Sequence, residues 1–209
     1  MNRIIQALLI AAVSIDEKED NRLDPDEAGW TEIYIGDEGS KFTLGVWWKL
    51  AEASEPSSHD FSWGNDEQAY AWMMRFTGHH ASSPIHASEK HDAKSSFAAC
   101  DPVTTTVGDC MILRLGAFED DDINEDVTGL EGHTTITMDR SNWGSATRSG
   151  GAAYEQQATP GVTSTPDFNF TASAESLTFT LPPAPPTPAV SATPAPSRPP
   201  RSGTHAPPP

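Results

Sequence analysis

The stretch that decides the fold is Lys41-Phe42-Thr43-Leu44-Gly45-Val46-Trp47-Trp48-Lys49-Leu50-Ala51. Large apolar side chains occupy every second position from Phe42 to Leu50, and Thr43, Gly45 and Lys49 stand between them. Successive side chains of a strand point to opposite faces, so this pattern predicts a strand with one buried face and one mixed face. The two adjacent tryptophans, one on each face, indicate a strand well inside a sheet.

A second stretch, residues 69–77, repeats this alternation. Tyr70, Trp72, Met74 and Phe76 share one face. We interpret the two strands as the middle of a β-sandwich, because each presents a continuous row of large apolar side chains to a core.

Turn signals separate further strand patterns at residues 8–15, 29–35, 59–63, 103–107, 110–118, 134–138, 152–158 and 168–181. Loops are predicted at residues 78–93 and 141–151, where the alternation is lost. No segment shows sustained helical periodicity. The sequence therefore predicts an all-β protein, an antiparallel β-sandwich of jelly-roll type with about nine to ten strands.

The first fifteen residues allow two interpretations. A basic start followed by an apolar run is typical of a signal peptide. The same run, apolar on both faces, also suits the central strand of a sheet. We prefer the strand, because no clean small-x-small cleavage site follows Ala11.

Composition divides the chain into two parts. Residues 1–181 can form one sandwich domain. Residues 182–209 are rich in Pro, Ala, Ser and Thr and hold no acidic residue. This tail is predicted to be extended or disordered, and dispensable for folding.

The chain is strongly acidic, with a formal net charge of −17 at pH 7. Phosphate binding needs clustered Lys and Arg, so we expect no nucleic acid and no anionic membrane surface as partner. High acidity suits a protein kept soluble at high copy number. The two cysteines, Cys100 and Cys110, are too few for a disulfide framework. Free, buried thiols are preferred over a bond between neighbouring strands.

One acidic loop has the spacing of calcium ligands. Asp120, Asp122, Asn124 and Asp126 alternate as in the first part of a calcium loop. The turn glycine and the closing bidentate Glu are missing, so a solvated loop is the competing interpretation. We expect no cofactor other than a calcium ion at this loop.

Histidines and hydroxyl residues do not form a catalytic pattern. The histidines of one predicted loop, His79, His80, His86 and His91, match no zinc spacing. A Gly-x-Ser-x-Gly elbow is also missing. We therefore expect the protein not to be an enzyme.

One tryptophan is a candidate for a ligand contact. Five of the six tryptophans fall in strand patterns, where core packing explains them. Trp143 lies in a predicted loop, Asn142-Trp143-Gly144, and could contact a glycan.

The order of several blocks resembles a known group of domains. The blocks are residues 8–15, 29–31, 44–51, 54–56, 70–78, 83–85, 103–107, 110–122 and 156–158. Together they resemble β-sandwich domains from structural proteins of tailed bacteriophages and environmental viral sequences. The resemblance implies a virion component, a capsid decoration or a tail or fibre module, that contacts other virion proteins and forms homo-oligomers. The alternative is a carbohydrate-binding or host-receptor-binding module that contacts a surface glycan.

Overall fold

The computed structural model describes residues 6–16, 18, 22–39, 41–119, 123–141 and 148–185, without the side chains of residues 171 and 172. Nine strands of seven or more residues form the described fold: β1 (Leu8–Asp16), β3 (Thr31–Glu38), β4 (Phe42–Leu50), β6 (Ala69–Phe76), β7 (Glu89–Ala99), β9 (Cys110–Phe118), β10 (Thr134–Arg140), β11 (Ser149–Gln157) and β13 (Asp167–Leu181). The described residues contain no helix, so the all-β prediction is confirmed.

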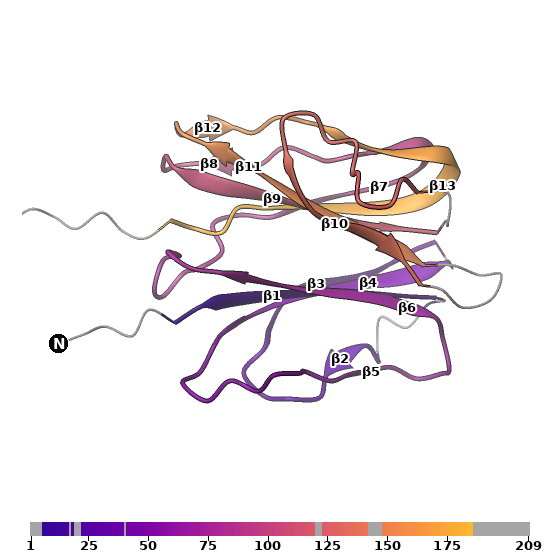
Figure 1. Ribbon diagram of the computed structural model, residues 1–209, viewed down its shortest axis with the longest axis horizontal. Helices are drawn as coiled ribbons and strands as arrows, with labels where there is room; N and C mark the ends of the chain where they lie inside the picture. Colours follow the sequence, from indigo (N-terminus) through magenta and orange to yellow (C-terminus); the bar gives the residue numbers. More distant parts are fainter. Residues whose placement is uncertain are drawn as a thin grey trace, which may run out of the picture.

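Two antiparallel sheets face each other (Figure 1). The first has the order β3-β4-β1-β6, and the second β10-β11-β9-β13-β7. Four two-residue strands complete the description: β2 (Asp24–Pro25), β5 (Phe61–Ser62), β8 (Thr104–Thr105) and β12 (Gly161–Val162). They pair as β2 with β5 and β8 with β12, outside the two main sheets.

The central core lies between the sheets. It joins Phe42, Leu44 and Val46 of β4 to Leu113 and Leu115 of β9. Trp48 and Leu50 pack against it, as the alternation predicted. β1 lies between β4 and β6 and is buried on both faces, so the strand interpretation of residues 8–15 is confirmed.

Four sequence predictions about strands and loops were wrong. Residues 69–76 form an edge strand, because among the described residues β6 has a strand neighbour, β1, on one side only. Part of the predicted loop 78–93 belongs to β7, whose strand pattern is hidden by polar side chains on both faces. β11 begins at Ser149, inside the predicted loop 141–151, and of residues 103–107 only Thr104–Thr105 are in a strand.

Each sheet carries a second apolar layer on its outer face. Under the first sheet, Val13, Ile15 and Trp47 pack with Leu23 from the loop after β1. Above the second sheet, Phe118, Met138 and Phe168 pack with Ile123 and Leu130. The first outer layer is visible in Figure 1 as the β2–β5 loops below β1 and β4. The face that was predicted to be mixed is therefore largely covered.

The two sheets repeat one unit. β1, β3, β4 and β6 occupy the same relative places as β9, β10, β11 and β13. A constant spacing of 103 residues relates Gly29-Trp30-Thr31-Glu32-Ile33 to Gly132-His133-Thr134-Thr135-Ile136. Both glycines have a positive φ, 95° and 76°. Such a backbone favours glycine, which explains why this residue recurs.

Backbone irregularities recur at the same spacing. The β3–β4 register shifts between Glu32 and Tyr34, and the β10–β11 register shifts between Thr135 and Thr137. A β-bulge at an equivalent place in both units is strong evidence that the two units share one design. We call residues 8–76 the N-terminal unit and residues 110–181 the C-terminal unit.

The chain stays attached to the sandwich beyond Leu181. The Pro182 and Ala184 carbonyls accept hydrogen bonds from the His86 and His80 amides, and the Ala184 amide donates to Pro84. Ala184 is also buried. The described body therefore continues to Pro185, and residues 186–209 lie outside the described part.

Candidate binding surfaces and buried charge clusters

Arg114 is the largest fully buried side chain and lies on the outer face of β9. Its guanidinium donates to the carbonyls of Asp101 (3.3 Å) and Ser164 (2.7 Å) and to the Thr180 hydroxyl (2.6 Å). It also forms an ion pair with Glu155 at 3.4 Å. Burial lowers the pKa of Arg114. These contacts fasten two loop segments, those of Asp101 and Ser164, to strands β9, β11 and β13 of the sheet.

Lys49 is the centre of a matching cluster in the N-terminal unit. Its ammonium contacts Glu55 Oε1 at 2.9 Å, and this carboxylate also lies 3.4 Å from His59 Nε2. His59 Nδ1 lies 2.6 Å from Glu27 Oε2. The hydrogen bond with Glu55 raises the pKa of Lys49. Burial raises the pKa of Glu55, but the Lys49 hydrogen bond and the Glu52 amide outweigh it, and the net direction is down.

Lys49 and Glu155 occupy the same strand position with opposite charge. Lys49 is opposite Leu9 in the sheet, and Glu155 is opposite Ile112, which is 103 residues further on. His133, at the place of Trp30, lies 3.5 Å from Glu155 with a side chain only 1% exposed. In both units the charge at this position is neutralised by a partner of opposite sign, Glu55 for Lys49 and Arg114 for Glu155. Both arrangements anchor loops to the sheets.

The four histidines considered as zinc ligands each fix a loop. His79 Nε2 lies 2.8 Å from the Gln6 carbonyl, and His80 Nδ1 accepts from the Ser83 amide. His86 Nε2 accepts from the Thr106 amide, and His91 Nδ1 lies 3.2 Å from Asp101 Oδ1. No group of three His, Cys, Asp or Glu side chains in the described ranges could hold a metal.

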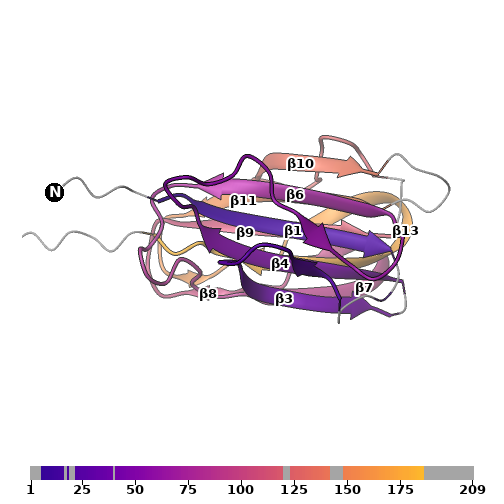
Figure 2. The ribbon, with the colours of Figure 1, turned by 90° about the horizontal axis from the view of Figure 1, so that it is seen from below.

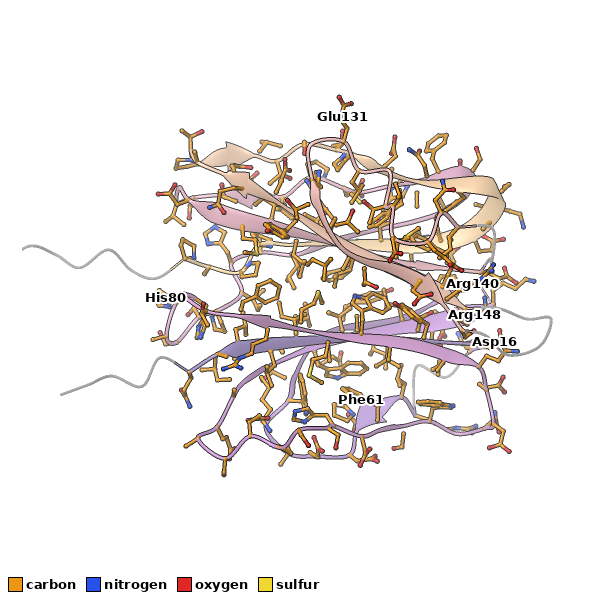
Figure 3. All side chains as sticks on the ribbon, in the orientation of Figure 1. Asp16, Phe61, His80, Glu131, Arg140 and Arg148 are labelled. Carbon is orange, nitrogen blue, oxygen red and sulfur yellow. The ribbon has the colours of Figure 1, made fainter. Side chains whose placement is uncertain are left out.

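The first three of these histidines line a hollow of about 900 Å³ at the end of the sandwich where β6 finishes. Phe76, Ile85 and Met111 supply its apolar wall, and Pro183 to Pro185 close one side. Figure 3 shows His80 at this end and the pair Asp16 and Arg148 at the other.

A second hollow, of about 1030 Å³, opens near the start of β6. We call it the Trp63 groove; it is lined by Phe61, Ser62, Trp63, Asn65, Asp66, Glu67, Gln68, Ala69 and Ser141. Half-buried aromatic rings next to amide and carboxylate side chains are the lining expected of a site for a polar ligand.

The wall of the Trp63 groove is held across the two sheets. The Arg148 amide donates to Ser141 Oγ at 3.0 Å, and the Arg148 guanidinium pairs with Asp16. The Asp16 amide in turn donates to the Gln68 carbonyl at 2.8 Å. The groove is therefore preorganised by a cross-sheet ion pair rather than carried on a free loop.

The residues predicted as ligands fall only partly within the structure. Asp120, Asp122 and Trp143 lie outside the described residues. Asn124 and Asp126 are described; the Asn124 carbonyl accepts from Val127, and the Asp126 amide donates to the Met138 carbonyl. These backbone bonds close the loop before β10, and calcium binding stays a prediction.

Cys100 and Cys110 are free and buried, as preferred from the sequence. Cys100 packs into the apolar layer on the outer face of the second sheet. Burial raises its pKa to about 12, and burial also raises the pKa of Cys110. Thiolates react and neutral thiols do not, so both side chains act as small apolar groups.

Sequence reasoning missed the Arg114 and Lys49 clusters and the Trp63 groove. The internal repeat was the signal that could have found the first two, since it aligns Lys49 with Glu155 inside buried strands. The groove had no comparable signal, because Ser141 reaches Gln68 only through the fold.

Comparison with known proteins adds no relative: no family model matches, and neither curated proteins nor solved structures give a match. Across the described ranges, no helix has the length and apolar character needed to span a membrane.

Proposed function

We propose that this protein is a non-enzymatic structural component of a tailed-phage virion, a capsid decoration or a tail or fibre module that assembles as a homo-oligomer. The ordered sequence blocks that resemble phage β-sandwich domains support this proposal. The acidic composition supports it too, since such a surface keeps a component present in many copies soluble before assembly.

The observation that carries the proposal is that the charged side chains hold loops in place. Arg114, Lys49, Glu155 and His59 bind loops onto the sheets instead of converging on an open cavity. Catalytic groups need access to a substrate. A self-covered sandwich stabilised in this way suits a rigid module whose task is attachment.

We further infer the jelly-roll type for the sandwich. The connections from β1 to β3 and from β9 to β10 pass over a neighbouring strand, since β1 pairs with β4 and β9 with β11. Long connections of this kind are used by Greek-key sandwiches, from which jelly rolls are built. An experimental structure of the assembled protein tests this type by its complete strand order.

The virion proposal is tested on particles. Virions purified by density gradient from the source population should contain this chain at a fixed copy number by quantitative mass spectrometry. Averaged particle images should then show the sandwich on the capsid or tail. Recovery of the chain only from the particle-free fraction would contradict the proposal.

The Trp63 groove favours a second candidate, a module that binds a glycan or another host receptor. Aromatic rings can stack on the apolar face of a sugar while neighbouring amides and carboxylates bond its hydroxyls. On a glycan array the wild-type chain should bind a defined set of sugars, and Asp66→Ala should lose that binding. Glu131→Gln, on the opposite side of the molecule (Figure 3), is the matched control. Equal signals from all three proteins would remove this candidate.

A further inference from the structure

The two units differ by one strand. In the C-terminal unit, β13 has a second neighbour, β7, which extends the sheet to five strands. β6 holds the place of β13 in the N-terminal unit and has β1 as its one strand neighbour among the described residues. The position next to β6 that corresponds to β7 therefore carries no described strand.

Strand β10, which lies opposite this position in the other sheet, is more exposed than its counterpart β3. β7 lies across from β3, where Lys90 of β7 reaches over the Tyr34 ring at 6.0 Å, and residues 33–38 of β3 are all at least half-buried. β10 is the counterpart of β3. Its residues 134 and 135 are exposed, as Thr31 and Glu32 are, but it also exposes residues 136 and 139, whose counterparts in β3 are half-buried. Thr137, the counterpart of Tyr34, contacts Tyr70 of β6 at 3.0 Å instead of an added strand. In Figure 2, β10 runs beyond β6 and overhangs this position.

The free edge of β6 lacks the bulges and charges that hinder the other three sheet edges from pairing with another chain. β3 and β10 carry bulges, and β7 carries alternating charges at Lys90, Asp92 and Lys94 together with a register shift in its pairing with β13. β6 pairs with β1 over eight consecutive residues without a shift and has one charged residue, Arg75. A regular, nearly uncharged edge is a template for pairing with another chain.

We propose that the free edge of β6 binds an extended strand donated by a neighbouring polypeptide chain. The strand runs antiparallel to β6, as β7 does to β13, and supplies about eight residues with free amides towards β6. Its inward side chains are small, polar or basic, to suit Thr134, Thr137 and Asp139, the β10 residues whose partners on β11 face the central core. Its outward side chains include an apolar residue beside Met73, which is 43% exposed.

A symmetric dimer through β6 does not fit this edge. Two copies paired β6 to β6 would bring their overhanging β10 strands into the same space (Figure 2). A single donated strand fills the position below β10 without that collision. The inference goes beyond the virion proposal and holds for any assembly in which the module is joined by strand addition.

Amide hydrogen exchange on the full-length chain tests the proposal. The probe is a synthetic peptide with the sequence of residues 89–99, because β7 occupies the equivalent position next to β13. The peptide should slow exchange in Ala69–Phe76 and leave the free edge of β3 unchanged. Met73→Lys should weaken binding at least about tenfold, since a charge on an edge strand opposes pairing. Val162→Lys, at an exposed position on the β8–β12 pair, should bind as the wild type does.

Three outcomes would overturn the proposal. The first is unchanged exchange in β6 at saturating peptide. The second is equal binding by Met73→Lys and the wild type. The third is β6 protection in the full-length chain without peptide that disappears when the chain ends at Pro185, because the protein's own tail would then occupy the edge. A peptide effect confined to β13 would mean displacement of β7 and would also contradict the proposal.

Discussion

Under the loops of the N-terminal unit a lysine faces a glutamate, and at the same strand position of the C-terminal unit a glutamate faces an arginine. The backbones of the two units agree in strand order, in a bulge and in a left-handed glycine, while the charge at the position of Lys49 and Glu155 is reversed. A buried charge is tolerated when its partner is present, whichever side supplies it. The unit therefore constrains where a buried ion pair stands but not its polarity.

The two clusters differ in how many segments they fasten. Arg114 reaches the Asp101 and Ser164 carbonyls, the Thr180 hydroxyl and Glu155. Lys49 has Glu55 as its ion-pair partner. A guanidinium can bond several acceptors in one plane, whereas an ammonium acts as a point charge. The C-terminal unit should depend more on its central cation than the N-terminal unit does.

The largest effect expected from this comparison is at Arg114. Arg114→Met should lower the free energy of unfolding by about 2–4 kcal/mol, because it leaves the Asp101 and Ser164 carbonyls without their Arg114 donor and removes the ion pair with Glu155. Lys49→Met should cost about 1–2 kcal/mol, since Glu55 keeps its bond from the Glu52 amide. Urea unfolding of the two variants measures both. A loss from Lys49→Met that equals or exceeds the loss from Arg114→Met would break the comparison.

Two glycines at equivalent places in the two units sharpen the comparison. Gly45 lies under the Trp47 ring, and Gly151, at the equivalent place, lies under the Met138 thioether with the Phe168 ring slightly further away. A methyl group on either would collide with its neighbour, but an indole is rigid and a thioether can move. Gly45→Ala should cost about 2–3 kcal/mol and Gly151→Ala about 1 kcal/mol in thermal unfolding. The reverse order would show that the N-terminal outer layer adjusts more easily.

Residues 182–185 contribute to the end of the sandwich near the histidine-lined hollow. A chain ending at Pro185 should keep the melting temperature of the full-length protein. A chain ending at Leu181 should lose about 2 kcal/mol, because three backbone hydrogen bonds are removed and Ala184 no longer covers the end of the core. Calorimetry on the two truncations separates these results. Equal melting temperatures would show that the segment adds nothing to stability.

The smallest expected effect is on the rate at which each outer layer opens, and it distinguishes the two layers. Cys100 reports opening of the C-terminal layer, because its pKa of about 12 keeps the thiol neutral until water reaches it. Trp47 reports on the N-terminal layer. Arg114→Met should speed labelling of Cys100 by an uncharged thiol reagent. Lys49→Met should alter tryptophan fluorescence but leave the rate of Cys100 labelling unchanged. Faster labelling in both variants would mean that the layers open together.

Local patterns in the sequence accounted for a large part of the sandwich. The alternation in Phe42–Leu50 and the apolar run of β1 gave their strands and buried faces correctly, and Cys110–Phe118 was predicted with its observed bounds. β7 was missed because its residues are polar on both faces; it becomes a strand by pairing with β13. The place of β6 at an edge depends on which strand fails to join it, and no local pattern records that.

By itself the sequence determined the alternation of side chains, the positions of turns and the acidic character of the chain, because each of these is a property of neighbouring residues. Only the tertiary structure decided the partner of Arg114, the Trp63 groove and the free edge of β6. Asp101, Ser164 and Thr180 lie 13, 50 and 66 residues from Arg114. Contacts over such separations arise from the way two sheets and their outer loops close on one another, and this geometry is set by the packing of the whole chain.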